Sequence, residues 1–277
     1  MITIGKYNTL TIDRHMSVGL YLTDGEGEDV LLPNKYIPDN FSIGDTIEVF
    51  VYLDSEERKV ATTLEPKIKL HEFGFLRVSA VTEVGAFMGW GLEKELLVPF
   101  KEQRQKMQPD RWYIVYLDLD EKTNRLFASN KLEKYLDNES IDLKPGDKVE
   151  LMVMQQSDLG YSVIVNHKHK GLVYENEVFK DINIGETMPG YVKTIRTDNK
   201  LDISLQPPGY ENTIDANVET VIRVLARNGG EVSVSDKSTP ETIYDTFGMS
   251  KKAFKKAIGK LLKEQKISLG EDGIALI

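Results

Sequence analysis

The sequence predicts a multidomain, mainly β protein, in which three tandem units of short strands precede one unit that mixes helices and strands. Three observations support this prediction. The same series of strand-like segments occurs three times before residue 206. Pro207, Pro208 and Gly209 then interrupt the strand pattern. Beyond them, apolar residues recur at the spacing of an amphipathic helix. The predicted domains span residues 1–65, 67–138, 142–207 and 211–277.

The strand signals are clearest between Val84 and Lys131. Phe87 lies two residues after a glycine, where strand alternation turns its side chain away from the neighbouring apolar positions. Residues 96–98 form a short apolar run that ends at a proline, and residues 113–117 are rich in β-branched and aromatic side chains. The last strand follows a polar turn and begins near Arg125. This order of signals predicts a small unit made of strands.

The same order of strand signals occurs before and after this stretch. Because the pattern repeats within one chain, each copy is better supported as a folded unit. The first copy has Val18-Gly19-Leu20-Tyr21 followed by Val30-Leu31-Leu32-Pro33. The third has Leu159-Gly160-Tyr161 followed by Gly171-Leu172-Val173-Tyr174. In both outer copies, a glycine, an acidic residue and a threonine follow at a similar distance from the first glycine, at residues 44–46 and 185–187.

This ordered set resembles the S1 motif, an RNA-binding β-barrel of the OB type. The resemblance implies three S1-type OB-fold barrels, with Phe87 as a base-stacking aromatic residue and Arg125 as a terminal basic residue on the second. Pro99 stands where many S1 members have histidine, and Tyr174 takes that place in the third copy. Arg196 stands where the family has an acidic turn residue, which makes that face more basic.

After residue 210, the apolar residues recur at a different spacing. Val218, Val221 and Leu225 form an apolar face at helical spacing. Residues 238–241 have the pattern of a capping box with an early proline, and Ser250 is placed to cap a longer helix. Two short strands complete the chain. The order helix, strand, helix, turn, helix and hairpin resembles a winged helix.

Three S1-type barrels followed by a winged helix resemble the conserved virulence factor B family of Gram-positive bacteria over essentially the whole chain. The resemblance implies a cytoplasmic RNA-binding regulator that affects the expression of other genes, including virulence genes in pathogens. The expected partner is single-stranded RNA, with DNA as an alternative. No catalytic residue, metal ion or cofactor is predicted, and the sequence specifies neither the RNA nor an oligomeric state.

The formal net charge of -9 argues against an electrostatic grip on nucleic acid along the whole chain. Residues 1–64 carry net -6, residues 67–136 net +2, residues 137–210 net -4 and residues 211–277 zero. A phosphate-binding surface must therefore be local. The acidic first unit is expected to be a spacer or a protein-contact module that adds little affinity for RNA.

Predicted RNA contacts are aromatic side chains that stack on unpaired bases and basic side chains that meet phosphates. They are Tyr21, Phe87, Trp90, Arg125, Tyr161, Lys168, Lys170, Tyr174, Lys193, Arg196, Lys200, Lys251, Lys252, Lys255, Lys256, Lys260 and Lys263. Trp90 has an alternative role as a lid that packs over the barrel. For the lysines after Ser250, the alternative is a solvated face of an amphipathic helix.

Other classes of function have weaker support. The chain has no cysteine, no apolar run near the roughly 20 residues of a membrane span and no signal peptide pattern, which fits a cytoplasmic protein. It lacks the P-loop, G-x-S-x-G and H-E-x-x-H motifs. His167 and His169 are a weak zinc pair, and the acidic loop at residues 24–29 is a weak calcium candidate. A DNA-binding transcription regulator and a metal-dependent nuclease or RNA-processing accessory factor remain alternatives.

Overall fold

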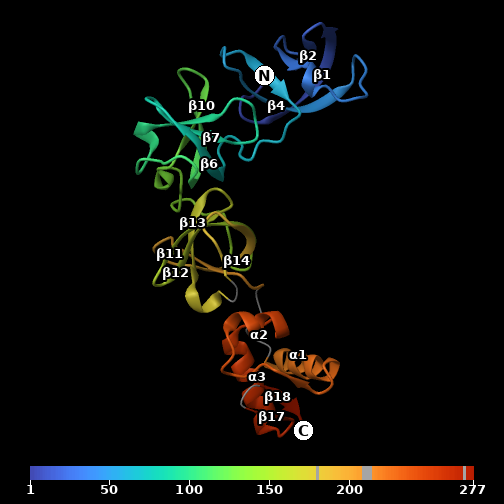
Figure 1. Ribbon diagram of the computed structural model, residues 1–277, viewed down its shortest axis with the longest axis vertical. Helices are drawn as coiled ribbons and strands as arrows, with labels where there is room; N and C mark the ends of the chain where they lie inside the picture. The colour runs from blue at the N-terminus through green and yellow to red at the C-terminus, as the bar shows by residue number, and fades with distance from the viewer. Residues whose placement is uncertain (179–180, 208–213, 271–272) are drawn as a thin grey trace. The chain divides into compact units, whose positions relative to one another are not determined.

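The computed structural model describes residues 1–178, 181–207, 214–270 and 273–277. The chain forms two compact units, Met1–Leu136 and Asp137–Ile277 (Figure 1). The helices and strands fall inside the four predicted ranges. The predicted start of the last domain, residue 211, lies outside the described residues. Among the described residues, no helix is long and apolar enough to cross a membrane.

The first barrel has the strand order β1-β2-β3-β5-β4 and closes on itself. Its parallel pair joins Leu31 of β3 to Val60 of β5. This five-stranded order is that of an OB fold. Its elements are β1 (Tyr7–Met16), β2 (Gly19–Thr23), β3 (Asp29–Pro33), η1 (Asn34–Tyr36), β4 (Thr46–Leu53) and β5 (Lys59–Thr62).

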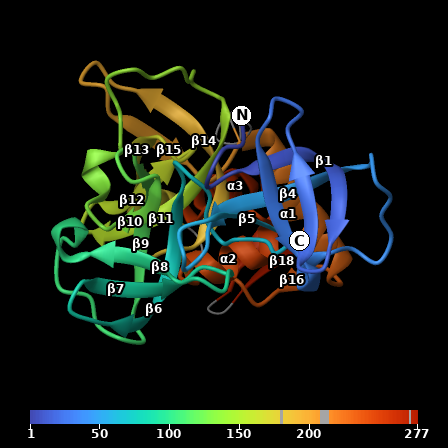
Figure 2. The ribbon, with the colours of Figure 1, turned by 90° about the horizontal axis from the view of Figure 1, so that it is seen from above.

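The second barrel follows the same order but is open between its third and fifth strands. Its sheet runs β10-β9-β6-β7-β8, and Figure 2 labels all five strands. No ladder pairs β8 with β10 within residues 67–136, all of which are described. Residues Phe100–Glu102 form a 3-10 turn, in which Glu102 is buried. The elements are β6 (Phe73–Val81), β7 (Gly85–Gly89), β8 (Leu96–Pro99), η2 (Phe100–Glu102), β9 (Trp112–Asp120), β10 (Arg125–Ser129) and η3 (Leu132–Lys134).

The third barrel is closed, with the order β11-β12-β13-β15-β14 and a parallel pair between β13 and β15. Its elements are β11 (Lys148–Ser157), β12 (Gly160–Val165), β13 (His169–Tyr174), η4 (Glu175–Glu177), β14 (Thr187–Ile195) and β15 (Leu201–Ser204). The structure therefore confirms three barrels of one kind.

One close approach explains the glycine that opens the second strand of every barrel. Gly19, Gly85 and Gly160 have φ values of 152°, 152° and 134°. A Cβ atom at these positions would lie 2.1, 2.3 and 2.1 Å from a carbonyl oxygen of the facing strand. Only glycine fits such a contact without moving the backbone. The repeated glycine in the sequence is thus a packing requirement of the barrel.

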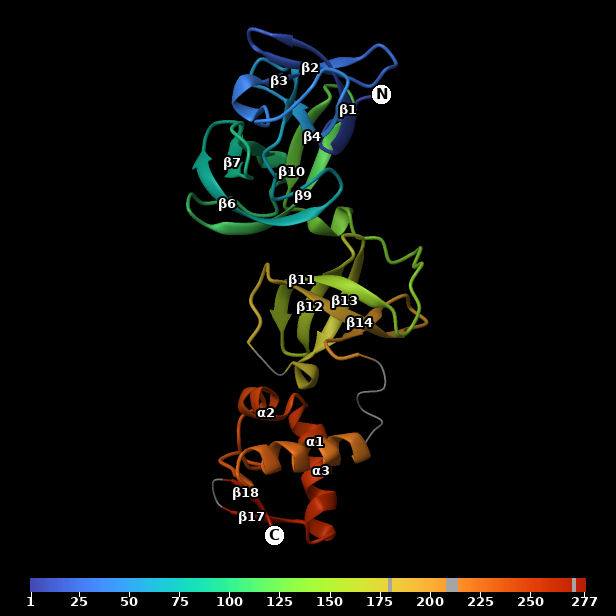
Figure 3. The same ribbon diagram turned by 90° about the vertical axis from the view of Figure 1, so that its right-hand side faces the viewer.

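The C-terminal region packs three helices on a small sheet of order β16-β18-β17 (Figure 3). Ser250 caps the third helix, as predicted, by accepting a hydrogen bond from the Ala253 amide at 3.0 Å. The cap of the second helix is Thr239 rather than Ser238, so the predicted capping box is one residue early. The elements are α1 (Ile214–Arg227), β16 (Glu231–Val232), α2 (Pro240–Phe247), α3 (Lys251–Lys263), β17 (Ile267–Leu269) and β18 (Ile274–Leu276).

The first barrel packs directly on the second. Phe50 and Tyr52 of β4 belong to the same apolar cluster as the core of the second barrel. Their rings meet the edge of Trp90 at centroid distances of 5.8 and 6.4 Å. Strand β4 of the first barrel therefore completes the core of its neighbour. The expectation that the acidic first unit adds little affinity for RNA stays a prediction.

Candidate nucleic-acid interface

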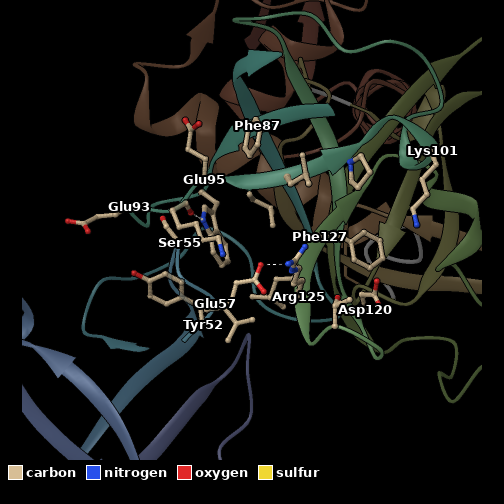
Figure 4. A pocket seen from close by; sticks show the side chains of 18 residues that line it. Tyr52, Ser55, Glu57, Phe87, Glu93, Glu95, Lys101, Asp120, Arg125 and Phe127 are labelled. Carbon is tan, nitrogen blue, oxygen red and sulfur yellow. Dashed lines mark hydrogen bonds and ion pairs between the residues drawn. The ribbon is translucent and has the colours of Figure 1, made fainter. Parts of the chain in front are cut away.

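A cavity of about 670 Å³ lies where the open side of the second barrel meets the first barrel (Figure 4). Its lining includes Phe87 and Arg125, the two residues on which the sequence argument for RNA binding chiefly depends. Strands β7, β8 and β10 supply seven of its 18 lining residues, and the others come from β4, the end of β9 and the connecting loops. In OB folds the second and third strands and the loop before the last strand form the face that binds oligonucleotides.

Phe87 faces this cavity because strand β7 alternates. Ala86 and Met88 on either side of it are fully buried in the barrel core. Phe87 is half-buried on the other face, where it pairs with Leu97 of β8. Its ring is therefore placed outside the core, with part of its surface open to a ligand.

Strand β10 contributes Arg125 and Phe127 to the same lining. Ala128 points into the core, so residues 125 and 127 share the outer face. Phe127 is not among the residues that the sequence predicts to contact RNA. Its position two residues after Arg125 on a strand is the signal that could have found it. The structure thus brings two phenylalanines and one arginine into one cavity.

Acidic groups of the first barrel also reach this cavity. Glu57 forms an ion pair with Arg125, drawn as a dashed line in Figure 4. Lys94 donates a hydrogen bond to the carbonyl of Asp54 at 2.7 Å, and its burial lowers the pKa of its ammonium group. The turn that contains Asp54 and Glu57 therefore covers one side of the predicted RNA-binding face.

Trp90 is not available for stacking on a base. Its side chain is only 2% exposed, and its indole Nε1 donates a hydrogen bond to the carbonyl of Lys94 at 2.6 Å. Edge contacts with Phe50 and Tyr52 explain this burial. The alternative role, packing over the barrel, matches its position in the structure.

Tyr21 is half-buried on β2 of the first barrel. The guanidinium carbon of Arg14 lies 4.2 Å from the centroid of its ring. Arg14 is itself held by Asp13 and Asp29 at 2.5 and 2.6 Å. The guanidinium of Arg14 thus covers one face of the Tyr21 ring, so less of the ring surface is available for stacking on a base.

Tyr161 of the third barrel is only 9% exposed and belongs to the barrel core. This burial corrects the expectation that it faces a ligand. Tyr174 is half-buried and accepts a hydrogen bond from Arg196, whose guanidinium also contacts Asp202 at 2.8 Å. The hydrogen bond with Asp202 raises the pKa of Arg196.

The other basic residues predicted on this barrel have acidic neighbours or partial burial. Lys200 pairs with Asp198 at 2.7 Å, and Lys168 lies 3.4 Å from Asp142. Lys193 pairs with Glu177, and Lys170 is half-buried on β13. Most of the positive charge of this face is therefore neutralised locally.

The two metal candidates are not supported by geometry. His167 lies in a turn with a positive φ of 53°, whereas His169 begins strand β13, so the two do not share a strand. The Nδ1 atom of His169 bonds to the carbonyl oxygen of Asp137. In the acidic loop, Asp24 accepts from the Glu26 amide and pairs with the amino group of Met1. Within the described ranges, no group of three or more His, Cys, Asp or Glu side chains is arranged to hold a metal ion.

Helix α3 separates its lysines from its apolar residues. Phe254, Ala257, Ile258 and Leu261 are buried in the domain core. Lys252, Lys255, Lys256 and Lys263 are exposed. The ammonium group of Lys251 instead donates to the carbonyl of Ser238 at 2.8 Å, and Lys260 lies 3.8 Å from Glu264.

Comparisons with known proteins agree with this architecture. A family model described as "S1 domain" matches residues 4–64, and one described as "CvfB-like winged helix domain" matches residues 219–276. The S1 match falls on the first barrel, whereas the strand signals of the sequence are clearest in the second. S1 and winged-helix domains are of nucleic-acid-binding rather than catalytic kinds.

Relatives match over most of the chain. "Uncharacterized protein YitL" of Bacillus subtilis is 29% identical over 272 residues, which cover 95% of this chain and 90% of that protein. "Conserved virulence factor B" of Staphylococcus saprophyticus is 28% identical over 260 residues, 90% of this chain and 86% of that protein. A crystal structure of a multidomain protein with nucleic acid binding domains from Streptococcus pneumoniae TIGR4 is 24% identical, covers 99% of this chain and 98% of its own, and has a TM-score of 0.43. The expected resemblance to the conserved virulence factor B family is thereby confirmed, with an S1 domain in the first barrel and a CvfB-like winged helix domain at the end of the chain.

Proposed function

We propose that this protein binds single-stranded RNA in the cytoplasm and, as the name of its relatives implies, affects the expression of other genes, including virulence factors. The observation that carries the proposal is the cavity of the second barrel, which Phe87, Phe127 and Arg125 line on the face that OB folds use for oligonucleotides.

The chemistry of this face fits an unpaired strand. The rings of Phe87 and Phe127 offer apolar surfaces on which bases stack, a contact worth about 1–3 kcal/mol per base. Arg125 is half-exposed and can exchange its contact with Glu57 for a phosphate. A duplex keeps its bases stacked on each other, so this face favours single strands.

The exposed lysines of α3 supply a second, electrostatic contact. These lysines are exposed, and α3 buries the opposite, apolar side, so we expect their replacement to leave the fold intact. Two weak sites on one chain bind more tightly together than either alone, because the second contact forms at a high effective concentration. Duplex DNA along α3 is the second candidate, since winged helices place a helix of this kind on DNA.

A competition experiment tests the proposal. Labelled single-stranded RNA bound to the full chain is challenged with unlabelled RNA and with duplex DNA of the same sequence at one salt concentration. We expect the single strand to compete at lower concentration. Equal or stronger competition by the duplex would favour the transcription-regulator alternative and place binding on α3.

A further inference from the structure

A second aromatic pair lies outside the cavity, on the outer surface of β6 and β9. The rings of Phe75 and Trp112 are 5.3 Å apart between centroids, with 31° between their planes. Trp112 is 49% exposed, although it is one of the largest apolar side chains in the protein. The neighbouring Leu76 and Val115 are fully buried, so the barrel core is complete without this pair.

Arg77 connects this pair with strand β7. It lies opposite Trp112 in the ladder with β9 and opposite Gly89 in the ladder with β7. Its guanidinium pairs with Asp110 at 2.7 Å, and both side chains are more than half exposed. Exposed ion pairs of this kind contribute little free energy, so a phosphate can take the place of the carboxylate.

The surface between Phe87 and Arg77 carries only small side chains. Gly89 lies two residues after Phe87 on the same outer face of β7. A Cβ atom at residue 89 would meet only the hydroxyl oxygen of Ser79, at 3.5 Å. Phe87 and Trp112 are separated by one intervening strand, which places them on the order of 10–12 Å apart along the sheet. A few nucleotides of extended RNA can span that distance over the surface of Ser79 and Gly89, which we call the lane.

We propose that Phe75, Arg77 and Trp112 form a second base-stacking platform, onto which single-stranded RNA continues from Phe87 across Ser79 and Gly89. The proposal rests on the proposed function and extends its path. Charge favours this occupant, because the second barrel carries net +2 while the first carries net -6. A tryptophan beside an arginine is the combination that stacks on a base and meets its phosphate.

The two tryptophans of the chain allow a direct test, because Trp90 is buried and Trp112 is exposed. The full chain is titrated with uridine oligonucleotides of about 4 and about 12 nucleotides, which bracket the site sizes of OB folds. We expect the longer oligonucleotide to quench tryptophan emission and the shorter one, held at Phe87, to leave it nearly unchanged. The quenching should vanish in Trp112→Phe.

Affinity gives an independent readout. Trp112→Ala should weaken binding of the longer oligonucleotide about 5- to 150-fold and leave the shorter one unaffected. Gly89→Glu should act in the same direction, because it places a carboxylate on the lane where the backbone tolerates a side chain. Ile43→Ala, which trims an exposed apolar residue of the first barrel, is the matched control.

The outcomes separate the two proposals. RNA binding that depends on Phe87, without quenching of Trp112 and without loss in Gly89→Glu, overturns the second platform and leaves the proposed function intact. If the unaltered chain does not bind RNA, the proposed function is overturned, and the proposal of a second platform is overturned with it. Loss of affinity for both oligonucleotides in Gly89→Glu would also overturn the platform, because the lane would then belong to the first site.

Discussion

Arg125 of the second barrel forms an ion pair with Glu57 of the first, so an acidic turn occupies the guanidinium expected to meet RNA phosphate. Asp54, at the start of the same turn, is tied to Lys94 of the second barrel through its carbonyl. The contact between barrels therefore competes with nucleic acid for Arg125. A negative unit placed beside a binding face lowers its affinity for an anion.

Glu57→Gln should strengthen RNA binding, because it removes that competition and one negative charge. An exposed ion pair is worth about 0.2–1 kcal/mol, so the gain should be up to about fivefold. Affinity measured with Glu57→Gln, Arg125→Gln and the double variant decides it. Glu57→Gln should have no effect once Arg125 is replaced. Independent, additive effects would show that the pair does not act on RNA.

Phe87→Ala should weaken binding of single-stranded RNA by about 1–3 kcal/mol, because a stacking surface is lost. The melting temperature should change little, since the ring lies outside the barrel core. Phe100→Ala, which trims another exposed phenylalanine of this barrel outside the cavity lining, is the control. A large drop in melting temperature accompanying the loss of binding would assign Phe87 to the core.

The barrels could be predicted from sequence because each one depends on local signals. The glycine at residue 19, 85 or 160 is fixed by the approach of the facing strand, and alternation then determines which neighbours enter the core. The resemblance to the S1 motif implied the OB-type barrel, and the structure supplies its strand order. These features are visible within about 60 residues of chain, and the structure has all three.

The site could be predicted only in part, because several contacts join residues far apart in the sequence. From the sequence, Trp90 could either stack on a base or pack over the barrel, and only the contacts with Phe50 and Tyr52 of the preceding barrel show that it is buried. Tyr161 directly follows its glycine, whereas Phe87 lies two residues after the corresponding glycine. Strand alternation therefore turns Tyr161 into the core. The charge of the first barrel predicted little affinity for RNA, but it did not reveal the apolar packing of β4 on the second barrel. Local pattern contains no information on such packing between repeats.

Trp90→Ala should destabilise the unit Met1–Leu136 by about 3–5 kcal/mol, the usual cost of removing a large buried aromatic side chain. Both barrels should lose stability together, because the ring packs against Phe50 and Tyr52. Chemical unfolding of the full chain measures this change. Trp90→Phe should cost less, since it retains an aromatic ring and loses chiefly the hydrogen bond to Lys94. A loss of RNA affinity without loss of stability would restore Trp90 as a ligand contact.

Glu102 should make the stability of the second barrel depend on pH. Burial alone would raise the pKa of its carboxyl, but hydrogen bonds from Lys134 and Ser129 outweigh burial, so the pKa lies below its ordinary value of 4.5. The ionised form therefore stabilises the fold above pH 4.5, and this contribution disappears as the pH falls through the folded-state pKa.

Glu102→Gln tests this pH dependence. It should cost about 1–3 kcal/mol at pH 7, where a hydrogen-bonded charge is lost. The difference from the unaltered protein should shrink as the pH falls below 4.5. Unfolding by urea at several pH values measures the difference, and a gap that stays constant down to pH 3 would rule out Glu102 as the titrating group.

Replacing Lys252, Lys255 and Lys256 of α3 with Gln should spare folding, because these side chains are exposed and the buried side of the helix is unchanged. If they meet phosphates of single-stranded RNA, each lost contact should flatten the slope of log affinity against log salt by about 0.7, or about 2 in total. The weakening should be nearly equal for all RNA sequences, since phosphate contacts position a strand without reading it. Affinity is measured at several salt concentrations for the unaltered chain, the Gln variant and a matched Lys→Arg variant, which keeps the charge and should keep the slope. An unchanged slope in the Gln variant would make α3 a solvated surface, and the RNA contacts would then lie on the barrels.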